Sequence, residues 1–261
     1  MPLETDFSAL PDYFPRRKPL LYAVLGDVHS NFEALDTVLK DIEKEGPDKI
    51  LSIGDIVGYA AEPSRCLAAV RKVTDTIVAG NHDYAAVGKM DIDYFNPQAK
   101  DAVLWTREHL SQEDRDFLSD LPLVIEMKQE GITLVHGTPY KPEQFYYLQT
   151  YHDAELCLSF LHSRICFIGH SHVPVAILKD GEVRAETKEE VSLKQTKQVI
   201  INVGSVGQPR DRDPRACYVL YDTGDELVRF RRLEYDIESA AKKIVEAGLP
   251  EFEAKRLKIG V

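Results

Sequence analysis

Five short apolar runs, each ending in a cluster of polar residues, organise the chain. They are residues 20–29, 49–55, 76–83, 132–137 and 165–172. Each run is rich in aliphatic and β-branched residues and closes near a glycine, which is typical of a buried strand. We therefore predict five buried strands whose carboxyl ends carry polar side chains.

Helical periodicity follows the first two runs. After the first, Ser30 and Glu33 have the spacing of a capping box, and apolar residues recur at helical intervals until Gly46-Pro47. Pro63 begins a second helical segment after the second run. A series of strand, helix, strand, helix and strand indicates parallel βαβ units with right-handed crossovers, and so an α/β fold.

Farther along, the chain changes from helix-linked strands to hairpins. Further helical patterns cover residues 97–120, 151–162, 237–247 and 251–258. Strand-like runs joined by glycine-bearing turns make up residues 123–137, 173–186 and 216–235. Two such different patterns of secondary structure would fit two domains, but polar clusters end apolar runs in both halves of the chain. We therefore predict one domain over residues 20–261, sharing one site, after an N-terminal extension of residues 1–19.

Composition and charge narrow the classes of partner. The 261 residues carry a net charge of −11, which disfavours long nucleic acid and anionic membranes because both need a basic face. An anionic small substrate stays possible because bound cations can invert the local field. Neither a signal peptide nor a run of roughly 18 apolar residues is visible, so we expect a soluble, cytoplasmic protein. Four cysteines without a C-x-x-C pair suggest buried free thiols.

The polar clusters supply the residue types that bind transition metals. They contain Asp27, His29, Asp55, Asn81, His82, His136, His170 and His172. Ligands in open α/β sheets bind beyond the carboxyl ends of strands, so we expect these side chains to converge. A lone strand-end histidine is usually structural, but five of them with two aspartates favour a metal site. Imidazole and carboxylate without thiolate suit Mn, Fe, Ni, Zn or Co, and the set is large enough for two divalent ions.

Five motifs follow one another in a fixed order between residues 27 and 172. They are Asp27-x-His29, Gly54-Asp55-x-x-Gly58, Gly80-Asn81-His82-Asp83, Val135-His136 and Gly169-His170-x-His172. Together they resemble the calcineurin-like metallophosphoesterase superfamily, and residues 202–211 are similar to its compact bacterial and archaeal members. The resemblance implies a four-layer α/β/β/α sandwich of two mixed sheets. The second motif lacks the Asp-Arg pair of protein serine/threonine phosphatases and diadenosine tetraphosphatases, so neither subfamily is expected.

The resemblance also implies a role for each matched residue. One ion would be held by Asp27, His29 and His172, and the other by Asn81, His136 and His170. Asp55 would bridge the ions, and the catalytic residue His82 would face the substrate phosphate. If protonated, His82 could stabilise developing charge or protonate the leaving oxygen, and Asp83 or Asp55 could orient its ring. The implied reaction is hydrolysis of a phosphomonoester or phosphodiester by direct attack of a metal-bridging hydroxide, without a phosphoenzyme.

Substrate contacts and the exact function stay open at this stage. Gln208 or Arg210 could reach a phosphate, with Tyr59 a further substrate contact, or residues 202–211 could form a turn in which Arg210 pairs with an acid. Several aromatic residues either wall the pocket or belong to the core: Tyr59, Tyr84, Tyr94, Phe95 and Trp105. We expect a small phosphoester or nucleotide as the substrate. The alternatives are a non-catalytic metal-binding scaffold of the same fold and a nuclease acting on short oligonucleotides.

Overall fold

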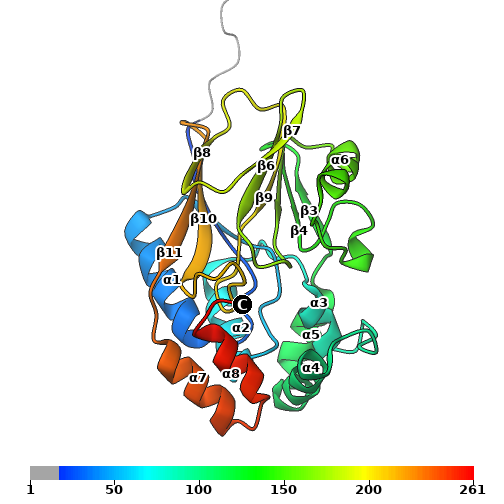
Figure 1. Cartoon of the computed structure of the whole chain (residues 1–261), viewed down its shortest axis with the longest axis vertical. Coiled ribbons are helices and arrows are strands. Elements are labelled where there is room, and N and C mark those ends of the chain that lie inside the picture. Colours follow the sequence, from blue (N-terminus) through cyan, green and yellow to red (C-terminus); the bar gives the residue numbers. More distant parts are fainter. Residues whose placement is uncertain (1–17) are drawn as a thin grey trace, which may run out of the picture.

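Two mixed β-sheets pack face to face, with helices on both outer faces (Figure 1). This arrangement is seen in a computed structural model that describes residues 18–261. The predicted N-terminal extension, residues 1–19, therefore lies outside the described residues except for its last two. The predicted four-layer α/β/β/α sandwich is confirmed.

The first sheet has the strand order β2-β1-β10-β11-β8. Its strands are β1 (Leu21–Leu25), β2 (Lys49–Ser52), β8 (Glu190–Ser192), β10 (Ala216–Asp222) and β11 (Leu227–Leu233). Strands β1 and β2 are parallel, as the predicted βαβ unit requires, whereas the other neighbours are antiparallel. The parallel pair brings the polar residues after β1 and β2 to one edge of the sheet.

The second sheet has the strand order β3-β4-β5-β9-β6-β7. Its strands are β3 (Val124–Met127), β4 (Ile132–Val135), β5 (Ile165–Ile168), β6 (Val175–Lys179), β7 (Val183–Glu186) and β9 (Gln198–Asn202). Strands β4, β5 and β9 are parallel to one another, and the remaining pairs are antiparallel. The carboxyl ends of β4 and β5 therefore meet beside each other.

Helices cover both sheets and close the chain. They are α1 (Phe32–Glu45), α2 (Pro63–Val73), α3 (Asn81–Ala86), α4 (Pro97–His109), α5 (Gln112–Asp120), the short 3₁₀ helix η1 (Pro142–Gln144), α6 (Tyr151–Phe160), α7 (Ile237–Glu246) and α8 (Glu251–Leu257). Figure 1 shows α1 on the side of the first sheet and α6 on the side of the second. Within residues 18–261, no helix has both the length and the apolar character needed to cross a membrane.

Side-chain alternation along the strands builds the layers, because successive residues of a strand point to opposite faces. In β1, Val24 packs in the core between the sheets, whereas Leu25 packs with the apolar residues of α1. In β5, Phe167 fills the inner core, whereas Ile168 packs against α6. All four cysteines are buried and free, as predicted.

Two local predictions are wrong. The run 76–83 forms only an isolated bridge between Ile77 and Ser52, and its last residues belong to α3, which begins at Asn81. The cap of α1 is Asn31, whose side chain accepts a hydrogen bond from the Ala34 amide at 3.2 Å. Ser30 is excluded as the cap by its left-handed backbone, with φ of 57°.

The inner core gives a direct test of the two-sheet packing. Phe167 is fully buried between the sheets, so Phe167→Ala should lower the free energy of unfolding by about 3–5 kcal/mol. Phe252 on α8 is 50% exposed, and Phe252→Ala should cost less than about 1 kcal/mol. Urea unfolding of both variants measures the difference, and equal losses would contradict this packing.

Candidate metal centre

The ends of four strands and one helix bring the predicted ligands together. Asp27 and His29 follow β1, Asp55 follows β2, His136 follows β4, and His170 and His172 follow β5. Asn81 is the first residue of α3. Their ligand atoms form two groups, each with all atoms within 4.8 Å of one another. The first contains Asp27, His29, Asp55 and His172, and the second contains Asp55, His136 and His170.

Apart from Asn81, these two groups contain the same residues as the two predicted ligand sets, and Asp55 belongs to both groups. Asn81 is the remaining member of the predicted sets, and its side-chain oxygen is buried without a hydrogen-bond partner among the described residues. The side chains of both groups are almost fully removed from solvent, from 0% exposed at Asp27 to 6% at His170. The predicted residues thus converge at one buried point.

The backbone holds five of these residues in an uncommon conformation. Left-handed φ angles occur at Asp27 (51°), His29 (48°), Asp55 (50°), His170 (67°) and His172 (59°). Each such residue costs on the order of 1–3 kcal/mol, and such residues cluster at functional sites. Backbone hydrogen bonds enforce the turns: the Asp27 amide donates to Gly54 O and the His29 amide to Asp55 O, both at 3.0 Å.

Two glycines are required because carboxylates lie against their backbones. A Cβ atom at Gly169 would lie 2.2 Å from Asp27 Oδ2, and one at Gly80 would lie 2.0 Å from Asp55 Oδ1. Any larger residue would displace the carboxylate. Gly169 and Gly80 are therefore needed for the carboxylates of Asp27 and Asp55 to occupy these positions.

Hydrogen bonds from ring nitrogens orient three imidazoles. Each Nδ1–H donates to a backbone carbonyl: His29 to Val57 at 3.1 Å, His136 to Ile53 at 2.8 Å, and His172 to Gln208 at 2.6 Å. A carbonyl only accepts, so the proton is on Nδ1 and the Nε2 lone pair faces the cluster. This tautomer is the one that metal-binding histidines adopt when a carbonyl fixes Nδ1.

The inward-facing lone pairs lie close enough to repel one another. His29 Nε2 is 3.1 Å from His172 Nε2, and His172 Nε2 is 3.1 Å from Asp27 Oδ1. His136 Nε2 lies 3.2 Å from Asp55 Oδ2, yet neither atom has a hydrogen bond of good geometry within the described chain. Buried acceptors without donors are costly, and a cation between them removes that cost. The residues therefore fit divalent metal ions.

The surroundings also set the protonation of the cluster. Burial lowers the pKa values of His29, His170 and His172 well below the usual range, which favours the neutral, metal-binding form. Burial raises the pKa of Asp27 to about 7, because its charged form is poorly solvated. A bound cation would stabilise the carboxylate and reverse this shift.

Asp55 and His136 act electrostatically as a pair. Burial alone would lower the pKa of His136, but the neighbouring Asp55 carboxylate outweighs it and raises the value to about 9. Without a metal, Nε2 of His136 therefore holds a proton that a bound cation would displace. Burial would likewise raise the pKa of Asp55, yet His136 and His82 hold it well below its usual range. Asp55 is thus ionised, as a ligand common to two cations must be.

His82 lies beside the ligand cluster among aromatic rings. Its ring centroid is 4.4 Å from that of Tyr59, 4.9 Å from His29 and 5.2 Å from Phe95. Burial lowers its pKa to about 4, although Asp55 opposes the shift. The imidazole is therefore neutral near pH 7, and these surroundings do not favour the protonated form, which the sequence analysis considered only as a condition.

Neither aspartate orients the imidazole of His82 through a hydrogen bond in the described structure. Asp55 Oδ1 accepts from the backbone amide of His82 at 2.8 Å. Asp83 accepts from the backbone amides of Ile56, Val57 and Gly80 at 2.9–3.2 Å. Asp83 thus holds the loop that carries Asp55.

A side-chain relay places Arg210 next to the cluster. Its Nε and Nη2 donate to Gln208 Oε1 at 3.3 and 2.7 Å, and Gln208 Nε2 donates to Glu253 Oε2 on α8 at 2.8 Å. After burial, Arg210 is the largest cause of the lowered pKa of His172, so its charge reaches the cluster. No carboxylate of residues 18–261 forms an ion pair with Arg210, so the alternative of an acid-paired turn is not observed.

The aromatic residues named from the sequence divide into two groups. Tyr59, Tyr94 and Phe95 line a cavity of about 240 Å³ that also contains Asn81 and His82. Tyr84 and Trp105 lie outside it: the Tyr84 hydroxyl donates to Leu121 O, and the Trp105 ring stacks on His109. For these two residues, the structural role is the correct one.

Sequence analysis missed two residues of the site. Tyr147 stacks on the ring of His170 with centroids 3.9 Å apart, and Glu253 anchors Gln208 from the last helix. A signal existed for the tyrosine, because the stretch Phe145-Tyr146-Tyr147 is aromatic and follows a predicted strand. Nothing in the spacing around Glu253 distinguishes it from the other acids of α8, because its partner is 45 residues away.

Comparison with other proteins agrees with this geometry. The sequence model of the calcineurin-like phosphoesterase superfamily domain matches residues 20–226. The protein MJ0912 of Methanocaldococcus jannaschii is 40% identical over 242 residues, which cover 92% of this chain and 98% of that protein.

Two solved structures are also similar. The metallophosphoesterase of Sphaerobacter thermophilus has a TM-score of 0.83 and 36% identity, covering 94% of this chain and all of that one. The hypothetical protein PH1004 of Pyrococcus horikoshii has a TM-score of 0.76 at 23% identity, covering 92% and 98%, which shows a shared fold. The chain therefore belongs to the calcineurin-like phosphoesterase superfamily.

Proposed function

We propose that this protein is a phosphoesterase that works with two divalent metal ions, one on each side of Asp55. The observation that carries the proposal is the pair of ligand groups that share Asp55, with their unpaired atoms turned inward. Asp27, His29 and His172 would hold one ion, and Asn81, His136 and His170 the other. When bound, two such ions supply an acidified water and positive charge for the phosphoryl oxygens.

Arg210 is proposed to bind the substrate phosphate. Gln208 accepts a hydrogen bond from the guanidinium of Arg210, and Glu253 in turn holds Gln208. The remaining N–H groups of the guanidinium are left for a planar contact with phosphate oxygens. The Tyr59 ring lies 5.5 Å from the guanidinium carbon and limits where it can move. The positive charge of Arg210 would thus be fixed before the substrate arrives.

His82 is proposed to donate a hydrogen bond to a phosphoryl oxygen. In its neutral form the ring still carries one N–H. Nδ1 is buried beside Gly58, so Nε2 is the nitrogen that could donate into the cavity that His82 lines. Its aromatic neighbours exclude water, and a donor is worth more in a dry site. This role needs no proton transfer from a group that burial keeps neutral.

The complete site favours catalysis over a binding scaffold. A scaffold that binds metal without turnover has no use for a placed cation such as Arg210 beside the ligand cluster. We propose a small phosphoester as the substrate and a cytoplasmic location. The net charge of −11 is unfavourable for long nucleic acid, so a nuclease for short oligonucleotides remains the second candidate.

Metal binding tests the two-ion assignment. Asp55→Asn removes the shared charge and should lower the metal content from two ions per chain to fewer than one, whereas His172→Ala should lose one ion. His152, exposed on α6, provides the control, and His152→Ala should keep two. Elemental analysis after equilibration with Mn²⁺ measures the content. Two ions retained by Asp55→Asn would contradict the assignment.

Phosphate binding by Arg210 predicts a kinetic effect of its substitution. With a nitrophenyl phosphoester and metal-loaded protein, Arg210→Ala should lower kcat/KM by about 10²-fold, because a fixed, charged donor is lost. Arg212 is two residues away but exposed, so Arg212→Ala should leave the value unchanged. Equal effects of the two substitutions would argue against the proposed contact.

The role of His82 is tested in the same assay. His82→Ala should lower kcat by about 10²- to 10³-fold while the metal content stays at two ions, because the ring contacts substrate rather than metal. If the metal content falls with the activity, His82 supports the ligands instead. If the unsubstituted, metal-loaded protein hydrolyses neither monoesters nor diesters, the alternative of a non-catalytic binding scaffold is favoured.

A further inference from the structure

Tyr147 lines two cavities, and the smaller of them contains the candidate ligands Asn81 and His170. The larger has a volume of about 780 Å³ and the smaller about 240 Å³. Tyr147 belongs to the irregular segment between η1 and α6, and its ring stacks on His170. A phosphate at the metal centre would therefore lie near two open cavities that share this tyrosine.

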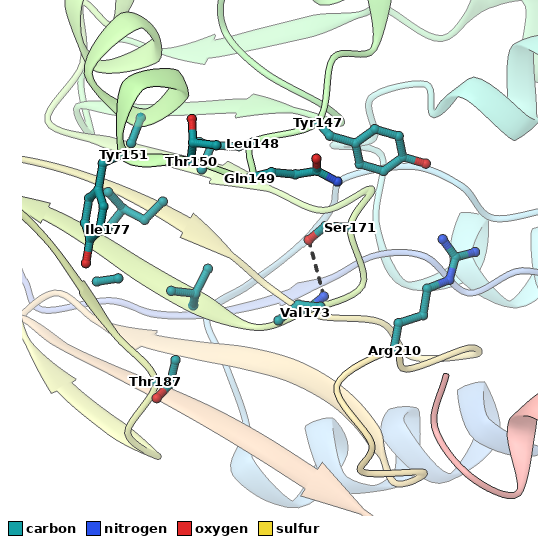
Figure 2. Close-up of a pocket in the computed structure, with 13 residues that line it drawn as sticks. Tyr147, Leu148, Gln149, Thr150, Tyr151, Ser171, Val173, Ile177, Thr187 and Arg210 are labelled. Carbon is teal, nitrogen blue, oxygen red and sulfur yellow. Dashed lines mark hydrogen bonds between the residues drawn. The ribbon is translucent and has the colours of Figure 1, made fainter.

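The near end of the larger cavity adjoins the ligand cluster. Arg210 and Ser171 line it, and Ser171 lies between the ligands His170 and His172 in the sequence. The Arg210 backbone amide also donates to the carbonyl of His172 at 3.3 Å. Figure 2 shows Arg210 and Tyr147 at one end of this cavity, on opposite sides of it.

The larger cavity is mainly apolar. Its lining includes Ala154 of α6, Val175 and Ile177 of β6 and Ala185 of β7, with Thr150 and Thr187 among them. In Figure 2, Tyr151 and Ile177 lie at the end opposite Arg210. Lysine, aspartate and glutamate are missing from the lining, and Arg210 at the near end is its one charged residue among those described. A phosphate joined to an apolar group would match this cavity, because the phosphate could contact Arg210 and the apolar group could contact the apolar lining.

The smaller cavity has a different chemistry. Asn81, His82 and His170 of the metal centre form part of it, and the rings of Tyr59 and Phe95 form another part. Flat rings and side-chain amides suit a planar aromatic group that also offers polar edges. Its volume is less than a third of that of the larger cavity, so the two spaces are not equivalent.

We infer that the substrate is a phosphodiester that places a planar aromatic substituent in the smaller cavity and a larger, mainly apolar substituent in the larger one. This inference rests on the proposed phosphoesterase function. A monoester carries one substituent and would leave one lined cavity without an occupant. Hydrolysis forms a bond from a water oxygen to phosphorus, breaks one P–O ester bond, and leaves a monoester and an alcohol that carries the proton.

A series of p-nitrophenyl alkyl phosphodiesters, with alkyl chains from methyl to octyl, tests the inference on the full, metal-loaded chain. We expect kcat/KM to rise on the order of fourfold for each methylene that the larger cavity buries. The longer diesters should also exceed p-nitrophenyl phosphate, the matching monoester. Calorimetric binding of octyl and methyl phenylphosphonates, which lack the scissile ester of nitrophenol, gives a readout independent of turnover, and the octyl compound should bind at least tenfold more tightly.

Ala185→Phe supplies the structural half of the test. Ala185 is an exposed residue of β7, so a larger side chain can be accommodated in the fold while it narrows the cavity. The octyl-to-methyl ratio should fall at least tenfold in both kcat/KM and binding. Ala68→Phe is the matched control, because Ala68 is exposed on α2 and lines neither cavity. The control should keep the ratio.

The outcomes separate this inference from the proposed function. Turnover that is indifferent to chain length, or a preference for the monoester, would overturn the phosphodiester inference and leave the phosphoesterase function standing. An unchanged octyl-to-methyl ratio in Ala185→Phe would overturn the assignment of the larger cavity. Chain-length-dependent phosphonate binding without hydrolysis of any ester would instead contradict the proposed function.

Discussion

Mutual repulsion among buried lone pairs is the constraint on which the rest of this structure depends. Nitrogen and oxygen atoms from residues as distant as Asp27 and His172 face one another at about 3 Å, and the carbonyls that accept from Nδ1 of His29 and His172 turn the Nε2 lone pairs of both rings inward. Such an arrangement is unfavourable by itself. Divalent cations would convert it into a favourable one, since each acceptor would then become a ligand and the binding free energy would add to the stability of the fold.

The two-sheet fold explains how the ligands reach one point. Parallel neighbours in each sheet align their carboxyl ends, so the ligands arrive from both halves of the chain at one edge. Left-handed backbone at five ligands then turns the side chains inward, and Gly80 and Gly169 leave room for the carboxylates. The backbone strain is local, and the packed sheets on either side hold it in place.

The sequence predicted the α/β class and the ligand cluster because both depend on short-range patterns: apolar runs, helical periodicity, and polar residues where runs end. The four layers were expected only from the resemblance to the family. It did not predict features that depend on distant contacts. Glu253 anchors Gln208 from the far end of the chain, and Tyr147 meets His170 only in the folded protein. The cap of α1 was misplaced by one residue, because Ser30 and Asn31 are both good caps and the backbone at the ligand loop decides between them.

The central claim is that two cations lie on either side of Asp55, and diffraction tests it most directly. Crystals grown with Mn²⁺ and measured at the manganese absorption edge give an anomalous difference map of the ion positions. The account predicts two peaks, roughly 3.5–4 Å apart, both adjacent to the Asp55 carboxylate. A map without a peak at this carboxylate, or with a single ion held by ligands other than those of the two groups, would contradict it.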